Sequence, residues 1–182
     1  MMLIKYIIST LLLSMILLST TLEAQERTVF QTKNIDEEYS LKAVFTLNFA
    51  RLTQWPYSDN SSITFCIMGN NSMLDAFKLI EHKRINSKNV TLKIISHDKD
   101  IINCQVLFLS GISHSRIRKL YSYARNHPIL TISEAEDISR SGAIINFIQN
   151  GDKIRFQINL NYSHQAGLKL SSRLLKLAII SE

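Results

Sequence analysis

Short apolar segments alternate along this chain with stretches of helical periodicity, and this alternation constrains the fold more than any other feature. The expected strands are rich in β-branched residues and bounded by glycine, proline, serine or asparagine; they cover residues 63–68, 90–95, 106–109 and 129–132. Helices are expected from Ser72, as N-cap, through Ile80, and over residues 114–126. Strands separated by helices indicate a mainly parallel sheet.

The last third of the chain adds two more strands and a helix. Residues 143–148 and 154–160 flank Asn150-Gly151, the strongest short hairpin signal in the sequence. A leucine-rich helix capped by Ser171 is expected to run to Ile180. The predicted fold class is therefore α/β, a single-domain sandwich with a mainly parallel sheet, a C-terminal β-hairpin at its edge and helices on both faces.

The first residues have the pattern of a signal peptide. Lys5 precedes an apolar run over Ile7–Leu18, and small residues up to Ala24 suit a signal peptidase. The alternative is a membrane anchor, but the run has about 12 residues where roughly 20 are needed to span a bilayer. We therefore expect residues 1–24 to be removed near Ala24, which leaves residues 25–182 as one exported domain.

The net charge of +6 is unchanged by that cleavage, because Lys5 and Glu23 leave together. In an exported protein a basic balance suggests a membrane surface, the cell wall or an acidic protein partner, or only solubility. Aromatic residues are not interleaved with basic clusters such as Lys83, Arg84 and Lys88. The prediction is a solvated basic surface and no nucleic-acid partner.

Cys66 and Cys104 are the only cysteines, so an exported chain can form one intramolecular disulfide in a single way. The alternative is two buried free thiols. Cys66 lies in the first expected strand and Cys104 just before the third, and these strands are neighbours in a doubly wound sheet of order 2-1-3. Such a bond closes a loop of 39 residues, worth about 4 kcal/mol in the chain-entropy treatment.

Catalytic motifs are missing from the sequence. The histidines are scattered without metal-ligand spacing, and no Gly-x-Ser-x-Gly nucleophile elbow is present. The segment Gly69–Ser72 opens a helix but lacks the glycines and the lysine of a phosphate-binding loop. We expect no enzyme, no cofactor and no metal site.

The stretch from Leu41 to Pro56 combines a helical repeat with an unusual end. Leu41, Val44, Phe45, Phe49 and Leu52 repeat with the spacing of one buried face, with Asn48 among them, before Trp55-Pro56. The hypothesis is structural: Asn48 hydrogen-bonds buried backbone near the helix exit, and Trp55 packs over the sheet edge. Pro56 favours an extended conformation at Trp55.

Six segments, covering about residues 37–178, occur in the order found in the YfiR family of periplasmic proteins (DUF4154), which this chain resembles. They read NFARLTQWP, ITFCIMGNN, NCQVLFLS, HPILTIS, SGAIINFIQNGDKIRFQIN and AGLKLSSRLLKLA. The resemblance implies an α/β fold that tends to dimerise. It also implies a periplasmic repressor of an inner-membrane diguanylate cyclase, which binds the periplasmic sensor domain of the cyclase and so lowers cyclic di-GMP and biofilm formation.

The resemblance also implies how repression is relieved. In the family an outer-membrane lipoprotein can draw the repressor away, and reducing conditions can inactivate it by breaking disulfides. Cys66 and Cys104 match family cysteines, whereas a second pair found in some members, near residues 139–148, is absent from this sequence. Redox control, if present, must therefore act through Cys66 and Cys104.

Two other classes of function stay open. One is a periplasmic ligand-binding sensor, because the carboxyl ends of parallel strands form a crevice where Gly69, Asn70 and Ser110 would lie. The other is an unrecognised exported hydrolase. The surface that binds a partner is not readable from the sequence; plausible exposed residues are Tyr121, Tyr123, Arg116 and Arg125, set against a plain solvated helix face.

Overall fold

The computed structural model describes residues 37–56, 61–134, 142–150 and 153–181. Residues Tyr39–Glu182 form one compact unit. The predicted signal peptide lies outside the described residues, so its cleavage stays a prediction. No helix in the described ranges is both long and apolar enough to cross a membrane.

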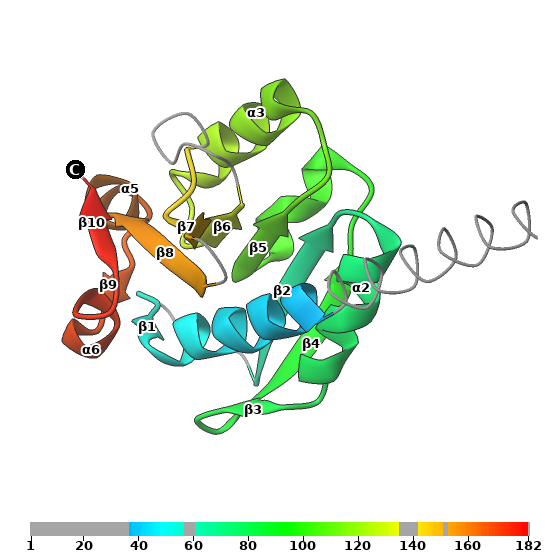
Figure 1. Ribbon diagram of the computed structural model, residues 1–182, viewed down its shortest axis with the longest axis horizontal. Coiled ribbons are helices and arrows are strands. Elements are labelled where there is room, and N and C mark those ends of the chain that lie inside the picture. Colours follow the sequence, from blue (N-terminus) through cyan, green and yellow to red (C-terminus); the bar gives the residue numbers. More distant parts are fainter. Residues whose placement is uncertain (1–36, 57–60, 135–141, 151–152, 182) are drawn as a thin grey trace, which may run out of the picture. The chain divides into compact units, whose positions relative to one another are not determined.

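An eight-stranded sheet of order β10-β8-β7-β6-β5-β2-β4-β3 forms the centre of this unit (Figure 1). Five of the strand pairs are parallel, and only β3/β4 and β7/β8 are antiparallel. The predicted α/β class is confirmed. The strands are β2 (Ser62–Met68), β3 (Arg84–Ile85), β4 (Lys88–Ile94), β5 (Val106–Leu109), β6 (Leu130–Ser133), β7 (Ile145–Asn150), β8 (Lys153–Asn159) and β10 (Ile179–Ser181).

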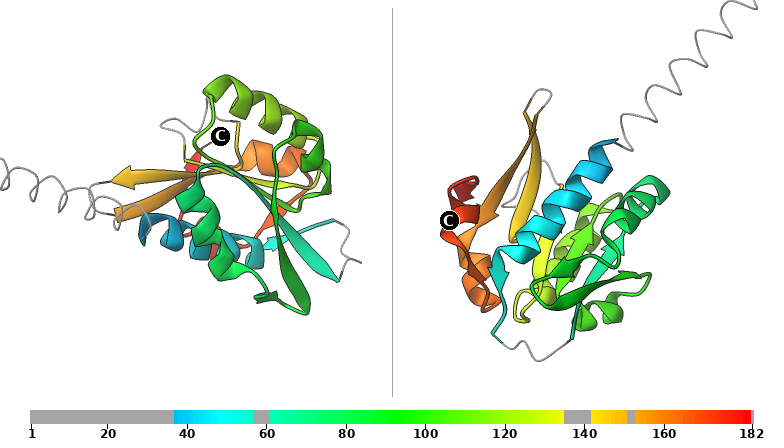
Figure 2. Two further views of the ribbon diagram at one scale, coloured as in Figure 1. Left: turned by 90° about the vertical axis from the view of Figure 1, so that its right-hand side faces the viewer. Right: turned by 90° about the horizontal axis from the view of Figure 1, so that it is seen from below.

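Helices cover both faces of the sheet, as predicted. In the left view of Figure 2, α3 lies on one side of the strands, and the first helix and α2 lie on the other. A second, two-stranded antiparallel sheet joins β1 (Thr53–Gln54) to β9 (Lys169–Leu170). The helical segments are the first helix (37–51), α2 (Asn71–Phe77), η1 (Lys78–Ile80), η2 (Asp98–Asn103), α3 (His114–Ala124), α5 (Leu160–Gln165) and α6 (Ser172–Leu175).

Alternation along the central strands divides the core into two clusters of buried side chains. On β2, Phe65 and Ile67 belong to the cluster that includes the first helix and α2. Cys66 and Met68, the intervening residues, belong to the cluster that includes α3. Successive residues of a strand point to opposite faces, so the continuously apolar strands are explained by helices on both sides.

The C-terminal segment differs from the expectation. Ser171 does cap α6, because its Oγ accepts a hydrogen bond from the backbone N–H of Leu174 at 3.2 Å. The helix ends at Leu175, however, and Ile179–Ser181 form β10, which pairs parallel with β8. The hairpin β7/β8 forms as predicted but lies one strand in from the edge. Pairing with β8 satisfies backbone groups that only tertiary structure brings together.

Candidate functional site

The predicted disulfide is confirmed: Cys66 and Cys104 are bonded, and their Cα atoms lie 5.7 Å apart. This separation is in the usual range for a disulfide. Cys66 lies within β2, which pairs parallel with β5, and Cys104 ends η2 just before β5 begins. The strand order β4-β2-β5 is the 2-1-3 arrangement expected from the sequence, and it places the two cysteines on neighbouring strands.

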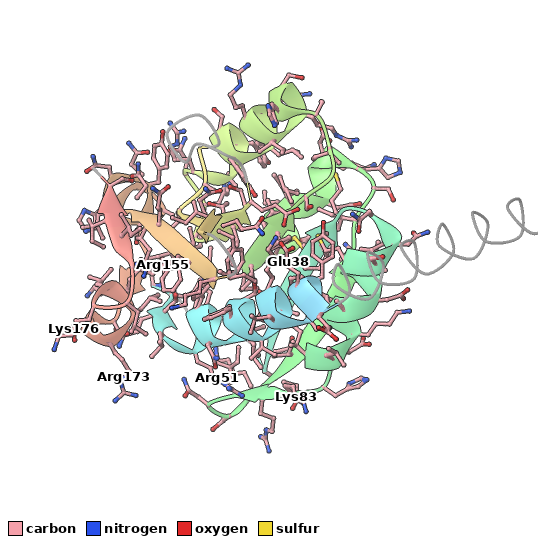
Figure 3. The ribbon with its side chains drawn as sticks, viewed as in Figure 1. Glu38, Arg51, Lys83, Arg155, Arg173 and Lys176 are labelled. Atoms are coloured by element: carbon pink, nitrogen blue, oxygen red, sulfur yellow. A yellow bond between two sulfur atoms is a disulfide. The ribbon has the colours of Figure 1, made fainter. Side chains whose placement is uncertain are left out.

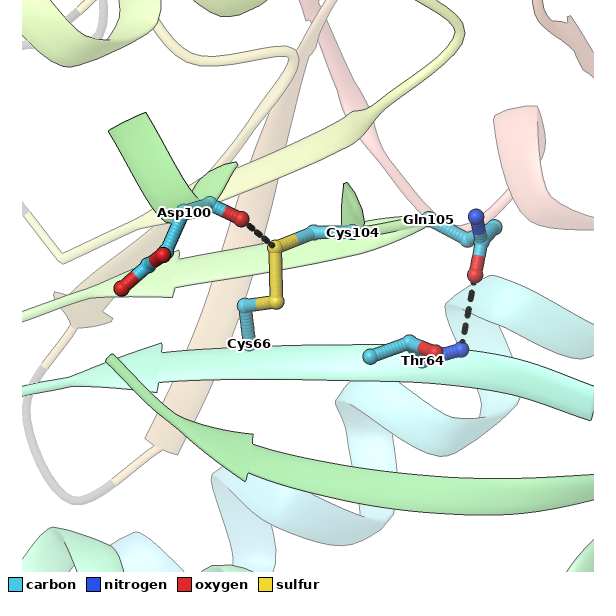
Figure 4. The surroundings of a disulfide bond; sticks show 5 residues. All are labelled: Thr64, Cys66, Asp100, Cys104 and Gln105. Atoms are coloured by element: carbon cyan, nitrogen blue, oxygen red, sulfur yellow. Dashed lines mark hydrogen bonds between the residues drawn. A yellow bond between two sulfur atoms is a disulfide. The ribbon is translucent and has the colours of Figure 1, made fainter. Parts of the chain in front are cut away.

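The disulfide is buried, and Figure 4 shows its nearest hydrogen-bonding neighbours. Cys66 is 0% and Cys104 is 2% exposed. The Sγ of Cys104 lies 3.5 Å from the carbonyl oxygen of Asp100, and next to the bond Gln105 Oε1 accepts a hydrogen bond from the N–H of Thr64 at 2.8 Å. A reductant can therefore reach the sulfur atoms only after local opening of the α3 side of the sheet.

A second feature lies at the carboxyl ends of the parallel strands, where five side chains form what we call the polar cluster. Its members are Tyr39, Lys42, Asn70, Ser110 and Glu134. Glu134 is central: it follows β6, and its carboxylate accepts hydrogen bonds from Lys42, Ser110 and Tyr39.

The polar cluster joins the first helix to the sheet. Lys42 Nζ lies 2.5 Å from Glu134 Oε2, and the two side chains are only 8% and 18% exposed. Tyr39 donates from its hydroxyl to Glu134 Oε1 at 3.3 Å, and Asn70 Nδ2 donates to the Tyr39 hydroxyl at 3.3 Å. The charges of Lys42 and Glu134 are therefore paired away from water, and the Glu134 carboxylate is surrounded by hydrogen-bond donors from several side chains.

The crevice residues expected from the sequence do come together. Asn70 and Ser110 both belong to the polar cluster. Gly69 permits the close approach of the strand ends, because an added Cβ would lie 3.2 Å from the Ser110 carbonyl oxygen and 2.1 Å from Met73 Cε. Sequence reasoning missed the charged pair of Lys42 and Glu134. A lysine within an apolar helical repeat and a glutamate directly after a buried strand were the available signals.

The hydrogen bond expected for Asn48 is wrong. Its Oδ1 accepts from Arg51 Nη1 at 3.1 Å on the exposed side of the helix, not from buried backbone. Leu41 and Val44 are each 46% exposed, whereas Ala43, Leu47, Phe49 and Ala50 are buried. Phe45 and Leu52 of the predicted face do pack against the core. The buried face is therefore rotated from the predicted one, with Phe49 shared and Ala43, Leu47 and Ala50 added in place of Leu41 and Val44.

Trp55 and Pro56, at the end of this segment, differ in burial. Trp55 is half-buried and packs against the cluster formed with the first helix, and its Nε1 has no hydrogen-bond partner among the described residues. Pro56 is exposed. Between the helix and Trp55, the two residues of β1 pair with β9.

The structure removes one of the four residues suggested for a partner surface and leaves the others untested. Tyr121 is wholly buried; its hydroxyl donates to the carbonyl of Ile132, and burial raises its pKa well above the ordinary tyrosine value. Arg116 pairs with Asp98 at 3.0 Å, and this hydrogen bond is the main cause that lowers the pKa of Asp98. Arg125 lies 4.0 Å from the centre of the Tyr162 ring. Tyr123 is exposed.

Metal-ligating side chains are dispersed in the part of the chain that the structure describes. No group of three or more histidine, cysteine, aspartate or glutamate residues lies close enough together there to hold an ion. The candidate functional features are therefore the disulfide and the polar cluster.

The fold and these features define a disulfide-bonded α/β domain with a polar cluster at the ends of its parallel strands. Residues 39–179 match the family described as YfiR/HmsC-like (DUF4154), and the chain belongs to this family. The resemblance noted in the sequence is thus confirmed. The family comprises periplasmic regulators of cyclic di-GMP signalling and is regulatory rather than catalytic.

Proposed function

We propose that this protein represses an inner-membrane diguanylate cyclase by binding the periplasmic sensor domain of that enzyme. The family match over residues 39–179 is the observation that supports the proposal. Held by the repressor, the cytoplasmic catalytic domains of the cyclase stay in an unproductive arrangement. Cyclic di-GMP then stays low, and biofilm formation is limited.

The proposal includes the assembly and the location of the repressor. The chain is exported, is cleaved near Ala24, and acts in the periplasm as a homodimer. An outer-membrane lipoprotein can act as antagonist by drawing the repressor away from the cyclase. N-terminal sequencing and light scattering of the exported protein test the cleavage and the dimer.

The disulfide makes the repressor dependent on an oxidising compartment. Cys66 and Cys104 join two neighbouring strands in the core, so their reduction removes a constraint worth about 4 kcal/mol in the chain-entropy treatment. Domains of this size usually have a stability of about 5 to 15 kcal/mol, so the disulfide accounts for roughly a quarter or more of it. Loss of the disulfide therefore weakens the fold on which binding depends.

The test is cellular cyclic di-GMP in a strain that lacks the gene and expresses a candidate cyclase. We expect the level to rise on deletion and to fall when the wild-type gene is restored. Restoring the double variant Cys66→Ala with Cys104→Ala should leave it high, because the fold is weakened. An unchanged level on deletion contradicts repression.

A control separates loss of the disulfide from loss of the protein. The periplasmic amount of the cysteine variant is measured by immunoblot, and its melting temperature is compared with that of the wild type. A variant that is present in normal amount and still represses would show that the disulfide is dispensable, while leaving the repressor function intact.

The polar cluster supports a second candidate function, a periplasmic sensor of a small ligand. Lys42, Glu134 and Ser110 converge at the carboxyl ends of the strands, where ligands bind in open α/β sheets. Calorimetric titration of the protein with nucleotides and amino acids tests this function. Heat of binding that disappears in Glu134→Gln would support it, and no heat with any compound would contradict it.

A further inference from the structure

The C-terminal edge of the large sheet is open. β10 is the last strand in the order, and it pairs only with β8, with Ile179 opposite Gln157 and Ile180 opposite Ile158. Within the described ranges no other strand pairs with β10. An edge strand presents backbone N–H and C=O groups that can pair with a strand of another protein.

Apolar side chains gather on this edge. Leu177 is 70%, Ile179 43% and Ile180 42% exposed. Their neighbour Leu174 is buried, and Leu175 and Ala178 pack against the core, so the segment is anchored while its outer side chains stay in solvent. Single exposed apolar residues are ordinary, but here Leu177 directly precedes β10 and Ile179 and Ile180 lie on its two faces. Exposed apolar side chains thus flank the open strand edge on both faces, which favours association.

The last part of the chain is rich in positive charge. From residue 153 to residue 181 the sequence holds five lysine or arginine side chains and no aspartate or glutamate. All five are exposed: Lys153 and Arg155 on β8, Lys169 on β9, and Arg173 and Lys176 on α6 or at its end. In Figure 3 the side chains of Arg173 and Lys176 project outward at the end of the molecule formed by β8, β9 and β10.

Two of these cations lie beside the apolar residues. Arg155 lies two residues from Gln157, which is opposite Ile179, so Arg155 and Ile179 are on the same face of the sheet. Lys176 directly precedes Leu177 in the chain. In the part of the chain that the structure describes, none of the five cations forms an ion pair with a carboxylate. We call β10 with Leu177, Ile179, Ile180 and the five cations of this segment the C-terminal edge.

The charge decides which partner fits. A second copy of the chain would bring two such basic segments together, which is unfavourable. A lipid surface would attract the cations, but it makes no use of an open strand edge. We propose that the C-terminal edge binds an acidic protein strand, which extends the sheet beside β10. This inference rests on the proposed function, since it names the surface that takes the cyclase sensor domain.

Binding of the purified exported protein to the purified sensor domain tests the inference. The double variant Arg173→Glu with Lys176→Glu should raise the Kd by about tenfold or more and reduce the dependence of binding on salt. The matched control is Lys99→Glu with Arg118→Glu, which makes the same change of charge on η2 and α3. Both pairs of side chains are exposed, so the fold should be unaffected, and equal melting temperatures check this.

Two further measurements address the apolar side chains and the strand. Leu177→Ser should also weaken binding, because it removes the most exposed apolar side chain of the C-terminal edge. Amide hydrogen exchange of Ile179–Ser181 should slow in the complex if a partner strand pairs with β10. Unchanged exchange in a complex that does form would contradict strand pairing.

The outcomes separate this inference from the proposed function. Absence of binding by the wild-type protein overturns both. Binding that is equal in the wild type, the edge variant and the control overturns the inference and leaves the proposed function standing. The wild type is also tested on vesicles that contain phosphatidylglycerol. If the edge variant loses vesicle binding but keeps binding to the sensor domain, the surface belongs to a membrane and the inference is overturned. A dimer that dissociates in the edge variant would do the same.

Discussion

At the scale of single residues, the ion pair of Lys42 and Glu134 decides how the polar cluster behaves. Both charges are largely withdrawn from water and lie 2.5 Å apart. A buried pair of this kind adds little net stability, because desolvation of the two charges offsets their attraction. Removing one partner is costly, however, since it strands the other charge.

A double-mutant cycle on Lys42→Met and Glu134→Gln measures this coupling. We expect each single variant to lower the free energy of unfolding by about 2 kcal/mol, less than for a fully buried pair because Glu134 keeps some contact with solvent. The double variant should lose less than the sum of the two, by about 1 kcal/mol or more. Urea unfolding gives all four values, and strictly additive losses would contradict a coupled pair.

Asn48 is the opposite case. Its position in the helical repeat predicts a buried polar group, but its side chain bonds on the exposed side of the helix. Because the Asn48 side chain accepts its hydrogen bond from Arg51 on the exposed side of the helix, Asn48→Leu should change stability by no more than about 0.5 kcal/mol. The matched substitution Leu47→Ala, at a buried neighbour, should cost about 2 to 4 kcal/mol. A large loss in Asn48→Leu, measured by urea unfolding, would restore the buried-partner hypothesis.

At the scale of elements, the start of α2 shows how a local signal can fall two residues from its true position. Ser72 was the expected cap, yet Asn70 takes the role: its Oδ1 accepts a hydrogen bond from the N–H of Met73 at 2.9 Å. Asn70 also donates to Tyr39. Asn70 therefore both caps α2 and takes part in the polar cluster.

Substitution at the two candidate caps distinguishes these positions. Asn70→Ala should lower the free energy of unfolding by about 1 kcal/mol, because it removes the cap. Ser72→Ala lies inside the helix and should have an effect of no more than about 0.5 kcal/mol. Urea unfolding of both variants gives the comparison, and a larger effect at Ser72 would contradict the structure.

At the scale of the whole molecule, two groups with shifted pKa values contribute to the pH dependence of stability. The raised pKa of Tyr121, caused first by burial and also by the nearby Glu134 charge, means that the native protein keeps a proton which the unfolded chain loses. The lowered pKa of Asp98, caused first by its hydrogen bond from Arg116, has the opposite sign. Stability should thus fall at both ends of the pH scale.

The urea midpoint as a function of pH tests these signs. The contribution of Tyr121 is fully present below the unfolded tyrosine pKa of about 10, and stability should fall above it by up to about 1.4 kcal/mol per pH unit. The contribution of Asp98 is present above about pH 4 and is lost as the pH falls below that value. Tyr121→Phe should flatten the alkaline limb; a limb as steep as in the wild type would contradict the assignment.

Much of the fold could be predicted from the sequence because it depends on local pattern. Val106–Leu109 is a strand at the expected residues, α3 ends within two residues of its expected end, and the hairpin around Asn150-Gly151 forms. The disulfide was also predictable, since two cysteines allow one pairing and a parallel sheet brings their strands together. These features follow from hydrophobic periodicity and turn residues alone.

The candidate site could be predicted only in part. Asn70 and Ser110 were expected at the strand ends, but Lys42 and Glu134 are 92 residues apart in the sequence, and no local pattern connects them. From the sequence, Tyr121 could lie on the buried face of its helix or on an exposed aromatic surface. Only the packing of α3 on the sheet decides between them. Charge pairing and exposure depend on which faces meet, so they needed the tertiary structure.

The sequence by itself determined the α/β class, the order of most strands and helices, and the single disulfide. Tertiary structure decided how far the first helix is rotated about its axis, which exposes Leu41 and Val44 and buries Ala43, Leu47 and Ala50. It also decided that the chain after α6 becomes an edge strand. The physical reason is that periodicity specifies a repeat, while packing against a particular sheet selects among repeats of similar hydrophobicity. For residues 179–181, the β-branched Ile179 and Ile180 suit a strand, and β8 supplies the backbone partner that makes one.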